Sequence, residues 1–360
     1  MWDVLARRYR DQLAQGQWPW RYETGVLLKA LWNAFETLGD EEFANAIEAW
    51  LQVTVAEDGT ICGYSAEQYQ LDHIQPGAVL LCAYRRSPQE RYRLALDRLM
   101  EQLRRQPRTR SGGFWHKAIY PHQMWLDGLY MAGPVMVGYA REFQAGRWAE
   151  EALYQMRLLY AHALNGKAKL CYHGWDESQK ERWADPSTGL SSQFWGRGMG
   201  WLAMALVDSF DAADPVMHAR AREHFAMMMQ EIAQGLARVQ DPDSGLWWQV
   251  LDRPHDTGNY EEASASAMFV YAFAKGARLG ILPRSAMRVA ERGYQGILRH
   301  LVVGGDGQAM RLVGCNRVSG LGGSPYRDGS YAYYVQAAPV DDEVKSVAAL
   351  IMAGSEVERT

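Results

Sequence analysis

Asp127 stands in surroundings that suit acid–base chemistry. It lies within the run MWLDGLYM, where a predicted helix begins and most neighbours are apolar. Burial among such side chains disfavours the charged form of a carboxyl group, and an acid held protonated near neutral pH can act as a general acid. The alternative is an ordinary aspartate near a helix start, where this residue type is common.

A second carboxylate has the same character. Asp72 follows Leu71 and precedes a helix that Pro76 and Gly77 open. If both aspartates lie in loops at one opening, they form the pair of carboxylates on which many sugar-cleaving enzymes depend. Taken alone, Asp72 is more typical of a capping or turn residue.

Cationic and imidazole groups occur in similar segments. Arg197, in the run FWGRG, could bind a carboxylate through two parallel hydrogen bonds, and the adjacent His116 and Lys117 could supplement it. The alternative for Arg197 is a structural ion pair. His173, in YHGWD, could orient a water or a sugar hydroxyl, although a lone histidine is more often structural.

Aromatic residues are unusually frequent. The 360 residues include 14 Trp and 19 Tyr but only 9 Phe, and many of the Trp fall in glycine-containing segments between helix-like stretches. A flat apolar face with a polar tip suits a sugar ligand, so a cluster of Trp in these segments indicates a carbohydrate pocket. The alternative for any single Trp is plain core packing.

Other ligand classes are disfavoured. The net charge of −4 offers no footprint for nucleic acid, and no apolar run approaches the roughly 18 residues of a membrane span. Nucleotide phosphate loops, zinc motifs and nucleophile elbows are absent from the sequence. We therefore expect no cofactor and no metal.

Cysteine usage points to a reducing compartment. Cys62, Cys82, Cys171 and Cys315 are far apart and show no metal-ligand spacing, so we expect free thiols. The N-terminus lacks the apolar core of a signal peptide, which predicts a cytoplasmic location.

The elements that must position these residues are helical. Apolar residues recur at helical spacing in paired segments joined by short breaks, and longer loops follow the second helix of each pair. The predicted pairs span 25–38 and 41–54, 76–83 and 88–103, 123–143 and 148–164, 200–210 and 215–236, 262–279 and 283–301, and 330–336 and 341–352. Short β-hairpins are expected at 246–252 and near 310–318. Six helical hairpins with all long loops at one end predict an all-α, (α/α)6 barrel in a single domain, residues 1–360.

Three segments resemble a known family. GGFWHK with YPHQMWLDGLYMA, YHGWDES with TGLSSQFWGRGMGW, and EEASASAMFVYAF are similar to glycoside hydrolase family 105, the unsaturated rhamnogalacturonyl hydrolases, and more distantly to family 88, the unsaturated glucuronyl hydrolases. The resemblance spans nearly the whole chain. It implies an (α/α)6 barrel without a cofactor, whose substrate is a lyase-generated oligosaccharide, rhamnogalacturonan-type in the first place, with a 4,5-unsaturated uronic acid at its non-reducing end.

The resemblance also implies a role for each matching residue. The reaction is hydration of the C4=C5 enol ether, with Asp127 as general acid and base, and with Asp72 and His173 supporting it. The residues implied to bind substrate are Arg197, Trp125, Trp195, Trp201, His116, Lys117 and Tyr22.

One stretch departs from the family pattern, and three alternatives stay open. The FWGR motif is followed here by Gly198, Met199 and Gly200, where the family carries a polar side chain. An inverting glycosidase, a sugar epimerase on the same fold or a non-catalytic carbohydrate-binding protein would also fit the residue types. The neighbouring sugar and the oligomeric state are not encoded in any pattern that we identify.

Overall fold

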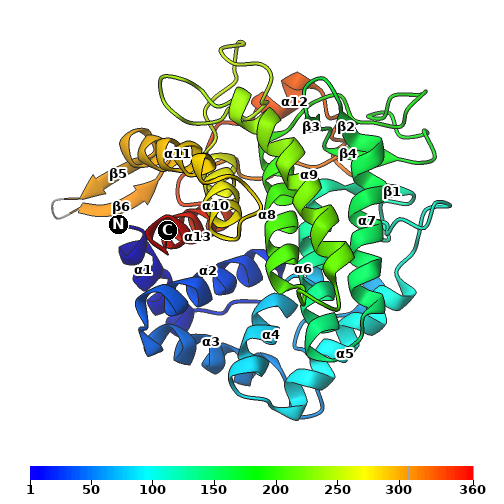
Figure 1. Cartoon of the computed structure of the whole chain (residues 1–360), viewed down its shortest axis with the longest axis vertical. Coiled ribbons are helices and arrows are strands. Elements are labelled where there is room, and N and C mark those ends of the chain that lie inside the picture. Colours follow the sequence, from blue (N-terminus) through cyan, green and yellow to red (C-terminus); the bar gives the residue numbers. More distant parts are fainter. Residues whose placement is uncertain (306–307, 360) are drawn as a thin grey trace.

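Six helices form a closed ring. The computed structural model describes residues 1–305 and 308–359, and within them it contains thirteen α-helices. In the ring each helix packs against the next, and the last packs against the first (Figure 1). In order, the ring helices are α2 (Tyr22–Leu38), α4 (Gly77–Arg86), α6 (Leu126–Glu142), α8 (Gly196–Ala212), α10 (Ala263–Arg278) and α13 (Val344–Arg359).

Six further helices cover the outside of this ring. Each packs on one inner helix, which confirms the predicted (α/α)6 barrel. The outer helices are α3 (Glu41–Thr54) on α2, α5 (Glu90–Arg105) on α4, α7 (Arg147–Ala163) on α6, α9 (Ala219–Arg238) on α8, α11 (Met287–His300) on α10 and α1 (Trp2–Gln15) on α13.

The predicted sixth hairpin is wrong. Residues 330–336 form only the short α12 (Tyr331–Val335), which is not an outer helix. The outer partner of α13 is instead α1 from the other end of the chain, and a Cβ atom on Gly354 would lie 2.4 Å from the Trp2 ring. The barrel therefore closes between the two chain ends. Pairing only helices that are consecutive in the sequence cannot predict this contact.

The two layers differ in how their surfaces are buried. Nearly every residue of α8 and α10 is buried, since ring neighbours and an outer helix cover them on all sides. A Cβ on Gly200 of α8 would lie 2.7 Å from the Met268 sulfur of α10, so these helices need glycine to approach so closely. Outer α5 is amphipathic instead, and buries one stripe that includes Leu96, Leu99 and Leu103.

The β-structure is confined to three short antiparallel pairs. The pairs are β1 (Gln123–Trp125) with β4 (Gly174–Asp176), β2 (Leu164–Asn165) with β3 (Leu170–Cys171), and β5 (Val302–Gly305) with β6 (Gln308–Leu312). The hairpin predicted near 310–318 thus exists, but it lies a few residues earlier. At 246–252 the structure has isolated bridges and no hairpin.

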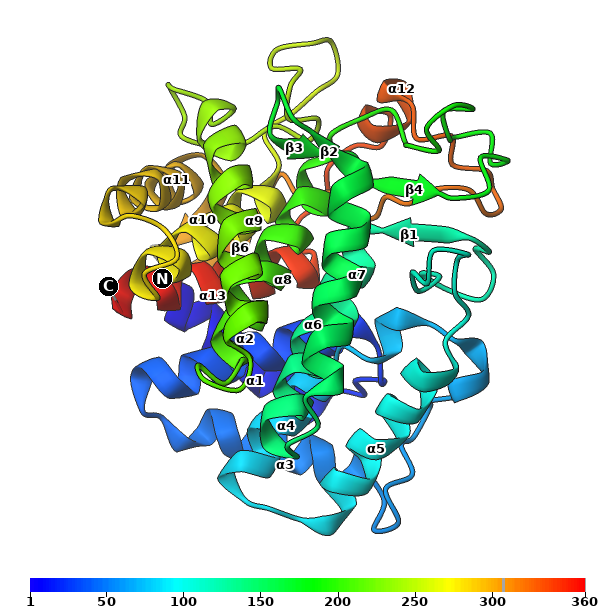
Figure 2. The same cartoon turned by 45° about the vertical axis from the view of Figure 1, so that its right-hand side comes forward.

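The long connections position the candidate residues. Each runs from an outer helix to the start of the next inner helix, as predicted. β1 and β4 bring two of these connections together, and they lie side by side among the loops (Figure 2). A short 3-10 helix, η2 (Leu71–His73), precedes α4 and packs on α6.

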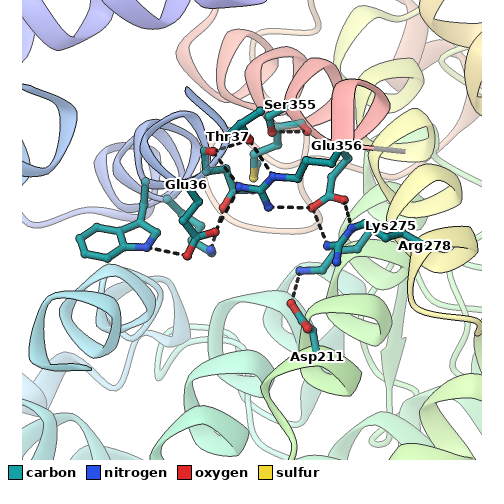
Figure 3. Close-up of polar contacts among 12 residues, drawn as sticks. Glu36, Thr37, Asp211, Lys275, Arg278, Ser355 and Glu356 are labelled. Atoms are coloured by element: carbon teal, nitrogen blue, oxygen red, sulfur yellow. Dashed lines mark hydrogen bonds and ion pairs between the residues drawn. The ribbon is translucent and has the colours of Figure 1, made fainter. Parts of the chain in front are cut away.

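The opposite ends of the inner helices carry charged side chains. There the Lys275 ammonium lies 2.8 Å from the Asp208 carboxylate. It also lies 3.0 Å from the Asp211 carboxylate, and Arg278 binds Glu356 through two hydrogen bonds (Figure 3). Basic residues suit these positions, because the last turn of a helix carries partial negative charge.

Two further findings concern the chain as a whole. Among the described residues, no helix combines the length and the apolar character needed to cross a membrane. The four cysteines are free thiols, as predicted.

Candidate active site

Strand pairing brings Asp127 and His173 together. Asp127 lies in the first turn of α6, two residues after β1, and His173 directly precedes β4. The amide of Leu126 donates to the His173 carbonyl at 3.0 Å, which extends the pairing to these residues. As a result His173 Nε2 lies 3.1 Å from Asp127 Oδ2. The contact joins residues 46 positions apart in the sequence.

The second nitrogen of His173 is also occupied. The imidazole is fully buried, and its Nδ1 lies 2.7 Å from the hydroxyl oxygen of Tyr334 in α12. Burial raises the pKa of Tyr334 well above its ordinary value, so the phenol stays neutral. A neutral phenol that donates to Nδ1 leaves the imidazole proton on Nε2, where it faces Asp127.

Close packing fixes the plane of this imidazole. The indole of Trp195 lies 4.5 Å from it, centre to centre. A Cβ on Gly198 would lie 3.1 Å from the Trp195 ring and 3.5 Å from His173 Cδ2. Gly198 belongs to the stretch that departs from the family motif, and because it has no side chain α8 can approach both rings.

Asp72 is held in a second charged cluster. Its carboxylate is buried, 2.5 Å from the Lys117 ammonium and 3.5 Å from His116 Nε2. Burial alone would raise the pKa of Asp72, but the charges of nearby basic groups, Lys117 first, and the Lys117 hydrogen bond together lower the pKa below its ordinary value. Asp72 is therefore a carboxylate at neutral pH, and it forms an ion pair with the Lys117 ammonium.

His116 is neutral under the same conditions. Burial lowers the pKa of His116 to about 4, and the nearby Asp72 carboxylate only partly opposes that shift. The imidazole stacks on Trp125 with a ring separation of 4.5 Å, and Tyr120 stacks on the same indole at 4.7 Å. His116 therefore packs against Trp125 and carries no charge at neutral pH.

The two aspartate clusters adjoin each other. Burial and the Asp72 carboxylate have the largest effects on the pKa values of His116 and Lys117, and the charge of Asp127 contributes by raising both. Tyr22, the first residue of α2, is close as well: burial raises its pKa well above the ordinary value, and Asp72 contributes. The structure thus gathers Asp72, Asp127, His173, His116, Lys117 and Tyr22 at one end of the barrel.

Arg197 is saturated by protein groups. Its guanidinium is 2% exposed, donates through Nε to Ser264 Oγ at 2.7 Å, and donates through Nη2 to the Asn316 carbonyl. Nη2 also lies 3.6 Å from Glu262 and 3.7 Å from Glu343. Burial would lower the pKa of Arg197, but these two carboxylates raise it. This arrangement matches the structural ion pair that is the alternative interpretation of Arg197 in the sequence.

The tryptophans predicted to line the pocket are covered. Trp125 is 5% exposed, and Trp195 and Trp201 are each 1% exposed. His116 and Tyr120 stack on Trp125, Tyr334 stacks on Trp195 and Tyr130 on Trp201. In this structure they pack against neighbouring side chains and offer no open face for a sugar.

Sequence reasoning missed three participants. Tyr334 and Glu343 lie in segments without a recognisable motif, and Glu262 was visible only as part of the quoted EEASASA run. Glu262 caps α10 by accepting hydrogen bonds from the Ser264 and Ala265 amides. Its burial next to Arg197 could not be read from spacing alone. Among the described residues, no group of three or more His, Cys, Asp or Glu is placed to hold a metal ion.

Comparisons with known proteins match most of the chain. The model of Glycosyl Hydrolase Family 88 matches residues 4–360. A solved glycoside hydrolase of family 105 from C. acetobutylicum ATCC 824 is 36% identical, with a TM-score of 0.93, over 100% of this chain and 99% of that one.

Curated relatives also match. Protein Atu3128 of Agrobacterium fabrum is 37% identical over 238 residues, which is 63% of this chain and 97% of that protein. The unsaturated rhamnogalacturonyl hydrolase YesR of Bacillus subtilis is 26% identical over 271 residues, 74% of this chain and 73% of that protein.

Proposed function

We propose a reaction for this chain from the premise that it belongs to Glycosyl Hydrolase Family 88, and is thus a glycoside hydrolase of the unsaturated glucuronyl and rhamnogalacturonyl type. The proposed reaction hydrates the C4=C5 enol ether of an unsaturated uronic acid at the non-reducing end of an oligosaccharide. The proposed substrate class is the rhamnogalacturonan type, which the function of YesR favours.

The contact between Asp127 and His173 carries the proposal. Asp127 is 15% exposed, so its carboxyl group can reach a ligand while its other face touches His173 Nε2. In the protonated form it transfers a proton to C4, and a water molecule adds its oxygen to C5 and returns a proton to the carboxylate. The resulting hemiketal opens by breaking the C5–O5 bond, with the C5 hydroxyl proton passing to O5, which leaves a ketone at C5 and a hemiacetal at C1. The hemiacetal then breaks its bond to the next sugar, which leaves as an alcohol while C1 becomes an aldehyde.

Other residues are assigned supporting roles. His173 orients Asp127, because its imidazole is fixed from both nitrogens. The Asp72 carboxylate and Lys117 ammonium offer an acceptor and a donor to sugar hydroxyls. No cofactor or metal takes part in the proposed reaction.

The test is the loss of the enol-ether absorbance. An unsaturated disaccharide incubated with the protein should lose its ultraviolet absorbance, because hydration removes the conjugated double bond. Asp127→Asn should abolish this loss and keep binding, since asparagine is nearly isosteric but cannot transfer the proton. General acid–base groups contribute about 10²–10⁴-fold.

Two outcomes contradict the proposal. The first is release of the intact unsaturated sugar with unchanged absorbance, which an inverting glycosidase would give. The second is an Asp127→Asn variant that keeps more than about a tenth of the wild-type kcat.

A further inference from the structure

The cations around the candidate site differ in how they are paired. Lys117 has Asp72, Arg197 has Glu262 and Glu343, and Lys345 has Glu343. Arg327 is the exception, since no carboxylate of the described residues lies within 4.0 Å of its guanidinium. A half-buried cation without a counter-charge is costly unless a ligand supplies one.

The Arg327 guanidinium is nevertheless fixed in place. Nε donates to the Gly322 carbonyl at 2.8 Å, and Nη2 donates to the Tyr120 hydroxyl at 2.7 Å and to the Leu321 carbonyl at 3.2 Å. Within the described part of the chain, Nη1 has no hydrogen-bond partner. The side chain is thus oriented by three acceptors and keeps one nitrogen free.

The surrounding loop is built to leave room for this group. A Cβ on Gly320 would lie 2.5 Å from Nη1, and a Cβ on Gly323 would lie 2.9 Å from Nη2. Gly323 also has a φ of +80°, which favours glycine. Any other residue at Gly320 would occupy the space beside the free nitrogen.

Arg327 lies next to the catalytic cluster. Its Cζ is 5.9 Å from the Trp125 ring centre and 5.7 Å from that of Tyr120. Trp125 precedes Asp127 by two residues. The charge of Arg327 also opposes the burial-driven rise in the pKa of Tyr334, the partner of His173.

We infer that Arg327 binds a carboxylate of the substrate through Nη1 and so selects acidic oligosaccharides. The inference rests on the proposed function and assigns to Arg327 the role that the sequence suggested for Arg197. Two carboxylates could supply this chemistry: that of the unsaturated ring itself, or that of a second uronate further along the chain.

Binding to Asp127→Asn protein tests the inference without turnover. Calorimetry would compare this variant with Asp127→Asn/Arg327→Gln, using the disaccharide of unsaturated galacturonate and rhamnose, its methyl ester, and the tetrasaccharide with a second uronate. Loss of a charge-assisted hydrogen bond should weaken binding of the free acid by about 10- to 100-fold. Binding of the ester should weaken by about threefold or less.

The pattern across substrates identifies the carboxylate. A selective loss with the disaccharide assigns the contact to the unsaturated ring, and a selective loss with the tetrasaccharide alone assigns it to the second uronate. The inference would be overturned if Arg327→Gln weakened binding of acid and ester equally or left affinity unchanged. It would also be overturned if the Asp127→Asn protein bound none of the acids. In the Asp127→Asn background, Gly320→Ala should reproduce the selective loss, since its Cβ displaces Nη1.

Two controls complete the design. Arg182→Gln removes a neighbouring exposed cation, which lies over the Tyr326 ring at 3.9 Å, and should leave affinity unchanged. The absorbance assay on wild-type protein separates the two claims. If the absorbance stays constant while acid binding still depends on Arg327, the proposed function fails and the inference stands.

Discussion

The hydroxyl of Tyr334 lies 2.7 Å from Nδ1 of His173, across 161 positions of sequence. This contact links the short helix α12 to the strand-flanking loop that carries the histidine. Because His173 Nε2 contacts Asp127, the three side chains form one hydrogen-bonded row from the protein interior to the candidate acid. Tyr334 touches no reacting atom in the proposed reaction, so its role is to position His173.

Removing that hydroxyl should slow the enzyme without unfolding it. Tyr334→Phe keeps the ring that stacks on Trp195 but loses the hydrogen bond, which is worth about 1 kcal/mol. We expect kcat to fall about 5- to 10-fold with KM little changed, measured by the absorbance assay. The pH profile of kcat should also shift, because the imidazole proton is no longer confined to Nε2.

A matched variant in the same helix provides the control. The Tyr331 hydroxyl donates to the Thr257 carbonyl, away from His173, so Tyr331→Phe should leave kcat unchanged. Equal losses in the two variants would mean that α12 acts only as a structural support.

His116 should make the protein less stable in acid. Burial lowers its folded-state pKa to about 4, whereas the unfolded chain has the ordinary value of 6.5. Between these values the unfolded state binds more protons. The contribution of His116 to the free energy of unfolding therefore falls as pH drops from 6.5 towards 4, and it is constant above 6.5. The contribution is at most about 3 kcal/mol.

The corresponding measurement is urea unfolding at pH 7 and pH 4.5. His116→Gln cannot titrate, so the variant should lose less stability than the wild type over this interval. An identical loss in both proteins would exclude His116 as a source of the acid sensitivity.

The sequence predicted local elements better than contacts between distant ones. Asp127 and His173 were identified from apolar and aromatic neighbours, but their 3.1 Å contact depends on the pairing of β1 with β4, and three-residue strands carry almost no sequence signal. The α1–α13 contact joins the chain ends, so consecutive helix pairs cannot reveal it.

Polar partners are equally hard to predict. Spacing identifies Arg197 as a cation among aromatics and glycines, but it does not reveal its contacts with Glu262 and Glu343. These two residues directly precede α10 and α13. Arg327 carries no motif at all. Its lack of a counter-charge is a property of the tertiary structure.

The buried ion pair at the far end of the barrel should matter for stability. Lys275 lies between Asp208 and Asp211, and Asp208 also accepts a hydrogen bond from Tyr271 at 2.7 Å. Lys275→Met would leave the Asp208 charge uncompensated, which costs about 3–5 kcal/mol. We expect a clearly lower Tm in calorimetry.

Neutralising the partner should restore part of that loss. In the double variant Asp208→Asn/Lys275→Met, no buried carboxylate is left without its cation, so Tm should recover towards the wild-type value. A Lys275→Met variant as stable as the wild type would contradict this account of the buried Lys275–Asp208 pair.

Chelation should leave activity intact. The proposed reaction needs only protein side chains and water, so exhaustive treatment with a chelator should change kcat by less than about twofold. Loss of activity that a divalent cation restores would disprove the proposed mechanism.

Arg197 provides the sharpest comparison with Arg327. Two carboxylates and three further acceptors already surround its guanidinium, so Arg197→Lys should loosen the contacts between α8, α10 and the loop around Asn316. Lysine cannot reproduce the planar fork that reaches Ser264 and the Asn316 carbonyl together. We therefore expect a lower Tm as well as a lower kcat/KM.

A double cycle of enzyme variant against substrate ester decides what the lost activity means. If Arg197 only braces the site, Arg197→Lys should reduce kcat/KM by the same factor for the free uronate and for its methyl ester, because neither contacts the residue. Arg327→Gln should reduce it far more for the free acid. A smaller loss with the ester for Arg197→Lys would show that Arg197 exchanges Glu262 or Glu343 for the substrate carboxylate. Arg197 would then bind the carboxylate of the unsaturated ring, and the selective role of Arg327 would be confined to a second uronate.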